Sequence, residues 1–126
     1  MTHQTKVMTI DDSPTMRALL RRALTERGYE VVQAEDGLVA LEWLEANDAQ
    51  SIDAIITDIN MPNLDGYGVI EKLRAQKRFQ NHPILVLSTE NSEQKKRHAR
   101  QAGATGWIVK PFDPDKLAAA LRRVIV

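Results

Sequence analysis

The chain has 126 residues, of which 43% are hydrophobic and 27% charged, as in an ordinary water-soluble domain with one buried core. Seventeen Lys and Arg residues balance seventeen Asp and Glu residues, so no general electrostatic attraction to nucleic acid or an acidic membrane is expected. Cysteine is absent, which excludes disulfides and thiolate metal sites. No apolar run has the length of a membrane span or a signal-peptide core, and we expect one cytoplasmic domain over residues 1–126.

Short apolar runs alternate with segments of helical spacing along the whole chain. The expected elements, in chain order, are a strand at Lys6–Asp11, a helix at Pro14–Arg27, a strand at Glu30–Ala34, a helix at Leu38–Ala46, a strand at Asp53–Asp58, a helix at Tyr67–Gln76, a strand at Pro83–Ser88, a helix at Asn91–Ala102, a strand at Gly106–Lys110 and a helix that begins at Pro114. The third and fourth strands are almost continuously apolar, which is typical of strands covered on both faces.

The first helix has the clearest end signals. Ser13 can cap its N-terminus, Pro14 suits its first position, and Gly28 follows its end. Asp113 and Pro114 begin the last helix in the same way. On the first helix we expect one apolar face to pack on the core, made of Met16, Leu19, Leu20, Ala23 and Leu24.

Strand–helix alternation of this kind predicts an α/β fold with a parallel, doubly wound sheet and right-handed connections. In such a sheet, ligands bind at the carboxyl ends of the strands. The side chains that follow each strand are therefore the first candidates for a functional site.

Three acidic residues end two of the predicted strands: Asp11 and Asp12 after the first, and Asp58 after the third. Carboxylates brought so close together repel one another unless a cation lies between them or some remain protonated. Oxygen donors without Cys or His favour Mg²⁺. A single Asp at a strand end is more often a helix cap or a turn residue, so the prediction depends on the group and not on any one of them.

A hydroxyl and an ammonium end the last two strands, at Ser88 and Lys110. Metal, hydroxyl and ammonium together suit a phosphoryl group, because each can bind one of its oxygens. One carboxylate of the cluster could then act as a nucleophile and form an aspartyl-phosphate. Taken singly, Ser88 could be a capping hydroxyl and Lys110 a solvated charge.

The sequence also resembles the receiver domains of bacterial response regulators, most closely the single-domain chemotaxis (CheY-like) type. The resemblance covers essentially the whole chain and implies a flavodoxin-like five-stranded parallel sheet of order 2-1-3-4-5 with five helices. It rests on Asp11-Asp12-Ser13, Thr57-Asp58-Ile59-Asn60-Met61-Pro62-Asn63-Leu64-Asp65-Gly66, Ser88-Thr89-Glu90, Gly103-Ala104-Thr105-Gly106 and Lys110-Pro111-Phe112.

The resemblance implies a role for each acidic residue. Asp58 resembles the phosphoacceptor. Asp12 resembles the direct Mg²⁺ ligand, together with a carboxylate oxygen of Asp58 and the backbone carbonyl of Asn60. Asp11 resembles the residue that binds the metal through water.

Other positions match the family's switch and lifetime residues. Ser88 matches the switch hydroxyl, and Lys110 matches the lysine that pairs with the phosphoryl group, in a Lys-Pro peptide that is typically cis in this family. Asn60 and Glu90 match two positions that tune the phosphoryl lifetime. Trp107 stands where the family usually has Tyr or Phe as a switch aromatic; it could equally be an ordinary, partly buried tryptophan.

The implied partners are a histidine kinase, as phosphohistidine donor, and a downstream protein that binds the face of the fourth helix, fifth strand and fifth helix. We expect chemotaxis or related two-component signalling, by a monomer that is not an ordinary enzyme and catalyses only its own phosphorylation and dephosphorylation. A phosphorelay intermediate or a phosphate sink is the alternative. An aspartate-nucleophile phosphatase would need a DxD pair and a cap domain, and dinucleotide binding would need a glycine-rich first turn. On the fourth helix a basic surface could bind an acidic or amphipathic segment, through Lys95, Lys96, Arg97, His98 and Arg100.

Overall fold

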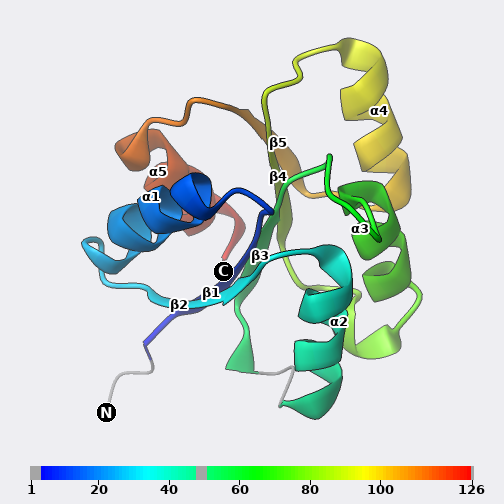
Figure 1. The fold of residues 1–126 in the computed structure, drawn as a ribbon, viewed down its shortest axis with the longest axis horizontal. Helices are drawn as coiled ribbons and strands as arrows, with labels where there is room; N and C mark the ends of the chain where they lie inside the picture. The colour runs from blue at the N-terminus through cyan, green and yellow to red at the C-terminus, as the bar shows by residue number, and fades with distance from the viewer. Residues whose placement is uncertain (1–3, 48–50, 126) are drawn as a thin grey trace.

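Strands and helices alternate from one end of the chain to the other in the computed structural model, which describes residues 4–47 and 51–125 (Figure 1). In chain order, the elements are β1 (Lys6–Ile10), α1 (Pro14–Thr25), β2 (Glu30–Ala34), α2 (Gly37–Ala46), β3 (Ala54–Thr57), α3 (Gly66–Arg74), the 3₁₀ helix η2 (Lys77–Phe79), β4 (Ile84–Ser88), α4 (Glu93–Ala102), β5 (Gly106–Val109) and α5 (Pro114–Val124).

The five strands form one parallel sheet in the order β2-β1-β3-β4-β5. This confirms the predicted fold class and the strand order that the family resemblance implied. The connection from β1 to β2 runs one way across the sheet, and the connection from β3 to β4 runs the other way. The chain therefore leaves β1 and β3 toward opposite faces of the sheet. A crevice forms at the carboxyl ends of strands where such a reversal occurs, and the end of β1 lies there.

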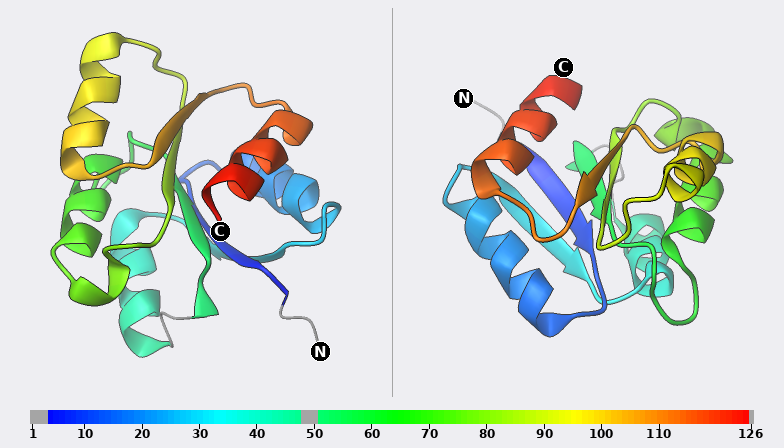
Figure 2. Two further views of the ribbon diagram at one scale, coloured as in Figure 1. Left: turned by 180° about the vertical axis from the view of Figure 1, so that it is seen from behind. Right: turned by 90° about the horizontal axis from the view of Figure 1, so that it is seen from above.

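The helices cover both faces of the sheet: α1 and α5 lie on one face, and α2, α3 and α4 on the other (Figures 1 and 2). Successive side chains of a strand point to opposite faces, so each inner strand contributes to two cores. Val7, Ile56 and Leu87 pack with α1 and α5, whereas Met8 and Ile55 pack with the three helices of the other layer. Burial on both faces explains why β3 and β4 read as continuously apolar.

Side-chain caps fix where the helices begin. The Ser13 hydroxyl accepts a hydrogen bond from the Met16 amide at 3.2 Å, as predicted for α1, and Asp113 caps α5. Ser92 caps α4, so this helix begins at Glu93 and not at Asn91. Caps of this kind each stabilise a helix by about 1 kcal/mol.

The prediction for Leu19 was wrong, because its side chain is 51% exposed. The buried stripe of α1 is made of Leu20, Ala23 and Leu24, and Met16 packs beside it, partly buried. A helix that lies on a flat sheet buries only the residues directly beneath its axis, and Leu19 projects to the side of that stripe. The helix also ends at Thr25, two residues earlier than predicted.

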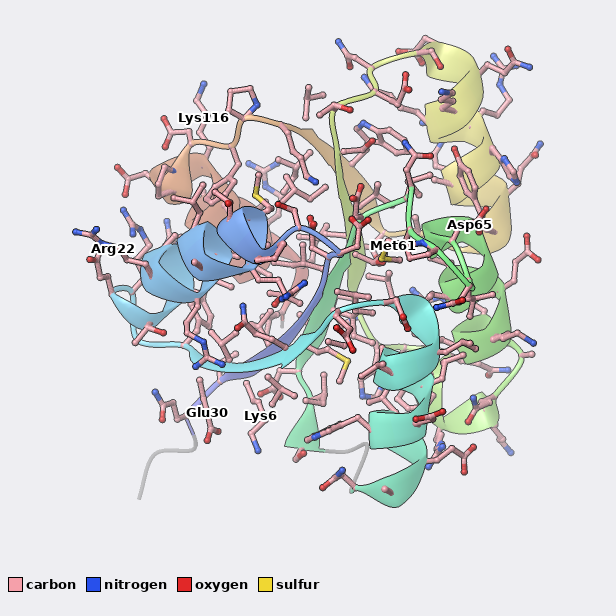
Figure 3. All side chains as sticks on the ribbon, viewed as in Figure 1. Lys6, Arg22, Glu30, Met61, Asp65 and Lys116 are labelled. Atoms are coloured by element: carbon pink, nitrogen blue, oxygen red, sulfur yellow. The ribbon has the colours of Figure 1, made fainter. Side chains whose placement is uncertain are left out.

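The sheet has two chemically different edges. At the amino ends of β1 and β2, the Lys6 ammonium lies 3.5 Å from a carboxylate oxygen of Glu30 (Figure 3). The acidic residues that the sequence placed at strand ends lie at the opposite, carboxyl ends of the strands. There β1, β3 and β5 each end one residue before Asp11, Asp58 and Lys110, respectively. Among the described residues, no helix is long and apolar enough to cross a membrane.

Candidate active site

Three carboxylates meet at the carboxyl edge of the sheet. Oxygens of Asp11, Asp12 and Asp58 all lie within 4.8 Å of one another. Asp11 and Asp58 are buried, whereas Asp12 is exposed, so the cluster opens to solvent on one side. The structure therefore brings together the acidic residues that the sequence picked out, although Asp11 and Asp58 are 47 positions apart.

Backbone hydrogen bonds fix Asp58 where β3 ends. Its amide donates to the Ile10 carbonyl at 2.9 Å, which extends the β1–β3 pairing by one residue. Its Oδ1 accepts a hydrogen bond from the Ile59 amide at 2.8 Å, so the other oxygen, Oδ2, points toward the cluster. Gly66 begins α3 directly beside this turn, and a Cβ there would collide with the Asp58 carbonyl. The glycine therefore lets α3 pack against the site.

Asp11 is held in a similar way at the end of β1. Its amide donates to the Ala34 carbonyl at 3.2 Å, and its Oδ1 accepts from the Ser13 amide at 2.9 Å. The Arg17 guanidinium donates to the Asp11 carbonyl at 2.7 Å. Nothing in the sequence pattern had indicated this role of Arg17, which positions the backbone between the two adjacent acidic residues.

Lys110 supplies the positive charge of the site. Its Nζ lies 2.9 Å from Asp11 Oδ2 and 3.3 Å from Asp58 Oδ2, and only 11% of its side chain is exposed. Its amide donates to the Ser88 carbonyl at 2.7 Å, which joins the ends of β4 and β5. The peptide between Lys110 and Pro111 is cis, as the family resemblance implied.

The charges of the cluster are incompletely balanced. Burial raises the pKa of Asp58; Lys110 opposes that rise, and the nearby charge of Asp11 adds to it. Burial alone would lower the pKa of Lys110, but its hydrogen bond to Asp11 and the negative charges of Asp58 and Asp11 together raise it. The ionised Asp58 is thus unfavourable in its surroundings, chiefly because it is buried, and Lys110 offsets only part of that cost.

This donor set fits Mg²⁺. The cluster offers carboxylate oxygens, one of them exposed and two buried, and its surplus negative charge would be offset by a divalent cation. Asn60, exposed two residues beyond Asp58, stays a predicted backbone ligand.

Three predicted switch and lifetime residues lie in direct contact with one another. Ser88 is fully buried, and its hydroxyl accepts a hydrogen bond from the Glu90 amide at 3.1 Å. The indole Nε1 of Trp107 donates to the Glu90 carbonyl at 2.9 Å. A Tyr or Phe could not make this contact in the same way, because only the indole has a ring N–H. The loop after β4 thus connects the buried hydroxyl to the aromatic side chain of β5.

The loop between β3 and α3 is held by a side-chain hydrogen bond that the sequence did not predict. Asn63 has a positive φ of 71°, and its side-chain amide donates to Asp36 Oδ2 at 3.1 Å. The Val39 amide, which bonds the other oxygen of Asp36, lowers the pKa of Asp36 together with Asn63. Met61, labelled in Figure 3, lies in the same loop and packs on the core. The signal for Asn63 was present, because Asn is one of the few residues that tolerate a positive φ.

The fold and the acidic site together define the class of protein. A family model of the response regulator receiver domain matches residues 7–122. The chain belongs to the response regulator receiver domain family, whose members are signalling proteins and not classical enzymes.

Within this family the chain is similar to single-domain chemotaxis proteins. It is 40% identical to the chemotaxis protein CheY1 of Helicobacter pylori over 121 residues, which cover 95% of this chain and 96% of that protein. The chemotaxis protein CheY homolog of Campylobacter jejuni is 36% identical over 95% of this chain and 92% of its own length.

Two solved structures extend the comparison. The chemotaxis protein CheY4 of Vibrio cholerae has a TM-score of 0.89 and 40% identity, covering 96% of this chain and 98% of that one. The receiver domain of the sensor histidine kinase PA1611 of Pseudomonas aeruginosa has a TM-score of 0.87 and 29% identity, covering 97% and 98%. That second structure contains a magnesium ion coordinated in its active-site cleft.

Proposed function

We propose that the protein is a phosphoacceptor switch, in which Asp58 accepts a phosphoryl group from a phosphohistidine of a histidine kinase. The observation that carries this proposal is the placement of the Asp58 Oδ2 atom beside Lys110 Nζ and within the acidic cluster. A carboxylate is a competent nucleophile for phosphoryl transfer once the charge of the transferred group is neutralised.

We assign Mg²⁺ to the cluster, with Asp12, Asp58 and the Asn60 carbonyl as direct ligands and Asp11 as a ligand through water. The magnesium-containing relative supports this assignment, as does the gathering of three carboxylates beside one ammonium. When bound, the cation would neutralise part of the charge on the transferred oxygens.

Asp58, Lys110 and Ser88 would then divide the chemistry. An oxygen of Asp58 forms the new bond to phosphorus while the bond between phosphorus and the donor imidazole nitrogen breaks. The Lys110 ammonium lies where it can pass from Asp58 to a phosphoryl oxygen, and the buried Ser88 hydroxyl can bind another. Hydrolysis by water would return Asp58 to a carboxylate, with Asn60 and Glu90 setting its rate.

Phosphorylation would change the surface of α4, β5 and α5, where we place the downstream partner. A phosphoryl group adds about 1.5 to 2 negative charges at neutral pH, which would attract the Ser88 hydroxyl. Ser88 contacts Glu90, and Glu90 contacts Trp107. A shift of Ser88 would thus alter the packing of Trp107, as expected for a switch with a coupling free energy of about 1–3 kcal/mol.

The likeness to chemotaxis proteins favours a role in chemotaxis, with a phosphorelay intermediate or phosphate sink as the alternative. A pull-down with beryllofluoride-treated protein, compared with Asp58→Ala, separates the two. Capture of a non-kinase protein only by the treated wild type would favour a direct output. Capture of kinases alone would favour the sink or relay. A single-domain, monomeric, cytoplasmic state that binds neither nucleic acid nor membrane stays a prediction.

The chemistry is tested by incubation with acetyl phosphate and Mg²⁺, followed by intact-protein mass spectrometry. We expect one added phosphoryl group on the wild type, and none on Asp58→Asn or in EDTA. Asp115→Asn, which changes an exposed aspartate on α5, is the matched control and should be labelled normally. A label of undiminished yield on Asp58→Asn would show that the acceptor has been misassigned.

A further inference from the structure

The residue that precedes Asp58 carries a buried hydroxyl. Thr57, the last residue of β3, is fully buried, and its Oγ1 donates a hydrogen bond to the Asp58 carbonyl at 2.9 Å. Its neighbours in register on β1 and β4 are Ile10 and Val86, which are both buried. A hydroxyl among apolar side chains is costly to leave unpaired, so this hydrogen bond is strongly favoured.

The Asp58 carbonyl belongs to the peptide that also holds the Asp58 carboxylate. The peptide unit between Asp58 and Ile59 is planar, so the position of its C=O fixes the direction of its N–H. That N–H, the Ile59 amide, donates to Asp58 Oδ1 at 2.8 Å. The other oxygen, Oδ2, lies 3.3 Å from Lys110 Nζ. The Thr57 hydroxyl is therefore connected to the direction of the carboxylate through one rigid peptide.

The backbone on either side of this peptide is held by other bonds. The Asp58 amide donates to the Ile10 carbonyl, and the Gly66 amide donates to the Ile59 carbonyl, both at 2.9 Å. These two bonds fix the path of the chain, whereas the tilt of the peptide between them depends on what its C=O and N–H contact. The Thr57 hydroxyl holds the C=O end.

We propose that Thr57 is a positioning residue for the phosphoacceptor, whose hydroxyl keeps the Asp58 carboxylate aimed at the acidic cluster. This inference rests on the proposed function of Asp58 as acceptor and Mg²⁺ ligand. Without the hydroxyl, the peptide can tilt, the Ile59 amide holds Oδ1 less firmly, and Oδ2 points to the cluster for a smaller fraction of the time. The loss of one such neutral hydrogen bond corresponds to a change of about five-fold in an equilibrium constant.

A second buried threonine provides a matched control. Thr9 lies on β1, the strand beside β3, and is also fully buried. Its hydroxyl has no hydrogen-bond partner among residues 4–47 and 51–125. Thr9→Val and Thr57→Val each replace a buried hydroxyl by a methyl group of similar size, but only Thr57→Val removes a hydrogen bond.

Hydrogen exchange in the metal-free protein tests the positioning directly. We expect the Ile59 amide to exchange about five-fold faster in Thr57→Val than in the wild type, and the Asp58 amide to exchange at an unchanged rate. Thr57→Ser, which keeps the hydroxyl, and Thr9→Val should leave both amides as in the wild type. An unchanged rate at Ile59, or an equal increase at both amides in Thr57→Val, overturns the proposal, because the latter would report only a loss of global stability.

Calorimetric titration with Mg²⁺ tests the consequence for the site. Thr57→Val should bind Mg²⁺ about five-fold more weakly than the wild type, with affinity restored in Thr57→Ser and unchanged in Thr9→Val. A wild-type affinity in Thr57→Val, or an equal loss in Thr9→Val, overturns the proposal. Failure of acetyl phosphate to label Asp58 in the wild type would instead refute the proposed function, while the hydrogen-exchange result would still decide whether Thr57 orients the carboxylate.

Discussion

Removing the ammonium of Lys110 should destabilise the metal-free protein strongly. Lys110→Met keeps most of the aliphatic stem but leaves the carboxylates of Asp11 and Asp58 without their counterion, at sites where little of either side chain is exposed. Loss of one partner of a buried ion pair costs about 3–5 kcal/mol. Because the Lys110 side chain is 11% exposed, we expect the lower end of that range, about 3 kcal/mol, or roughly 10 °C in Tm for a domain of this size.

The pH dependence of this loss follows from the two pKa shifts. Lys110 has a raised pKa, so its contribution to stability is fully present below the ordinary lysine value of 10.5 and is lost as pH rises through the folded-state pKa. Asp58 also has a raised pKa, so the folded protein binds its proton more tightly than the unfolded chain does. As pH falls through that raised value, Asp58 becomes neutral and needs its counterion less. The difference in Tm between Lys110→Met and the wild type should therefore be largest between the raised pKa of Asp58 and the ordinary lysine value of 10.5, and should narrow on both sides.

Thermal unfolding followed by circular dichroism, in EDTA and in Mg²⁺, measures the effect. Mg²⁺ should recover part of the loss in Lys110→Met, since a divalent cation can replace some of the missing positive charge. Lys116→Met is the control, because Lys116 is an exposed lysine on α5 at the outer surface of the molecule (Figure 3). If Lys110→Met and Lys116→Met melted at the same temperature in EDTA, the ion pairs of the cluster would not have the strength assigned to them.

Three further predictions concern the surroundings of the site. Gly66→Ala should lower the free energy of unfolding by about 2 kcal/mol in urea titrations, because the new Cβ would collide with the Asp58 carbonyl; an unchanged midpoint would show that α3 can move aside. Asn63→Ala should be less stable than Asn63→Gly by about 1 kcal/mol, since Ala is strained at a φ of 71°; equal stabilities in the same titration would contradict that reading. Beryllofluoride with Mg²⁺ should change the tryptophan fluorescence of the wild type and of Trp43→Phe but not of Trp107→Phe, and a response that survives in Trp107→Phe would rule out Trp107 as the switch.

The sequence sufficed to predict the fold and to group the acidic residues. Parallel strands bring their carboxyl ends to one edge, so a residue that follows a buried apolar run has a predictable place whatever the side-chain details. This is why the sequence alone could predict that Asp11, Asp58 and Lys110 lie close together. The roles assigned to them are a separate matter and stay predictions.

The contacts that sequence reasoning missed depend on how two elements pack. Asn63 meets Asp36 only because α2 lies against the loop after β3, and 27 positions separate the two residues. Lys95 meets Glu90, five positions earlier, because side chains in the first turn of α4 lean back toward the loop that precedes the helix. The error at Leu19 has a related cause: helical spacing gives the direction of the apolar face but not the width that a flat sheet will cover.

The ion pair between Asp11 and Lys110 spans 99 positions, nearly the full length of the chain. A nascent polypeptide, or a proteolytic fragment, that ends before β5 would lack Lys110, whose ammonium pairs with Asp11 and Asp58 in the described part of the chain. Such an incomplete product would be both poorly stable and unable to receive a signal. Because this ion pair joins the end of the first strand to the end of the last, only a chain that includes Lys110 would be able to accept a phosphoryl group.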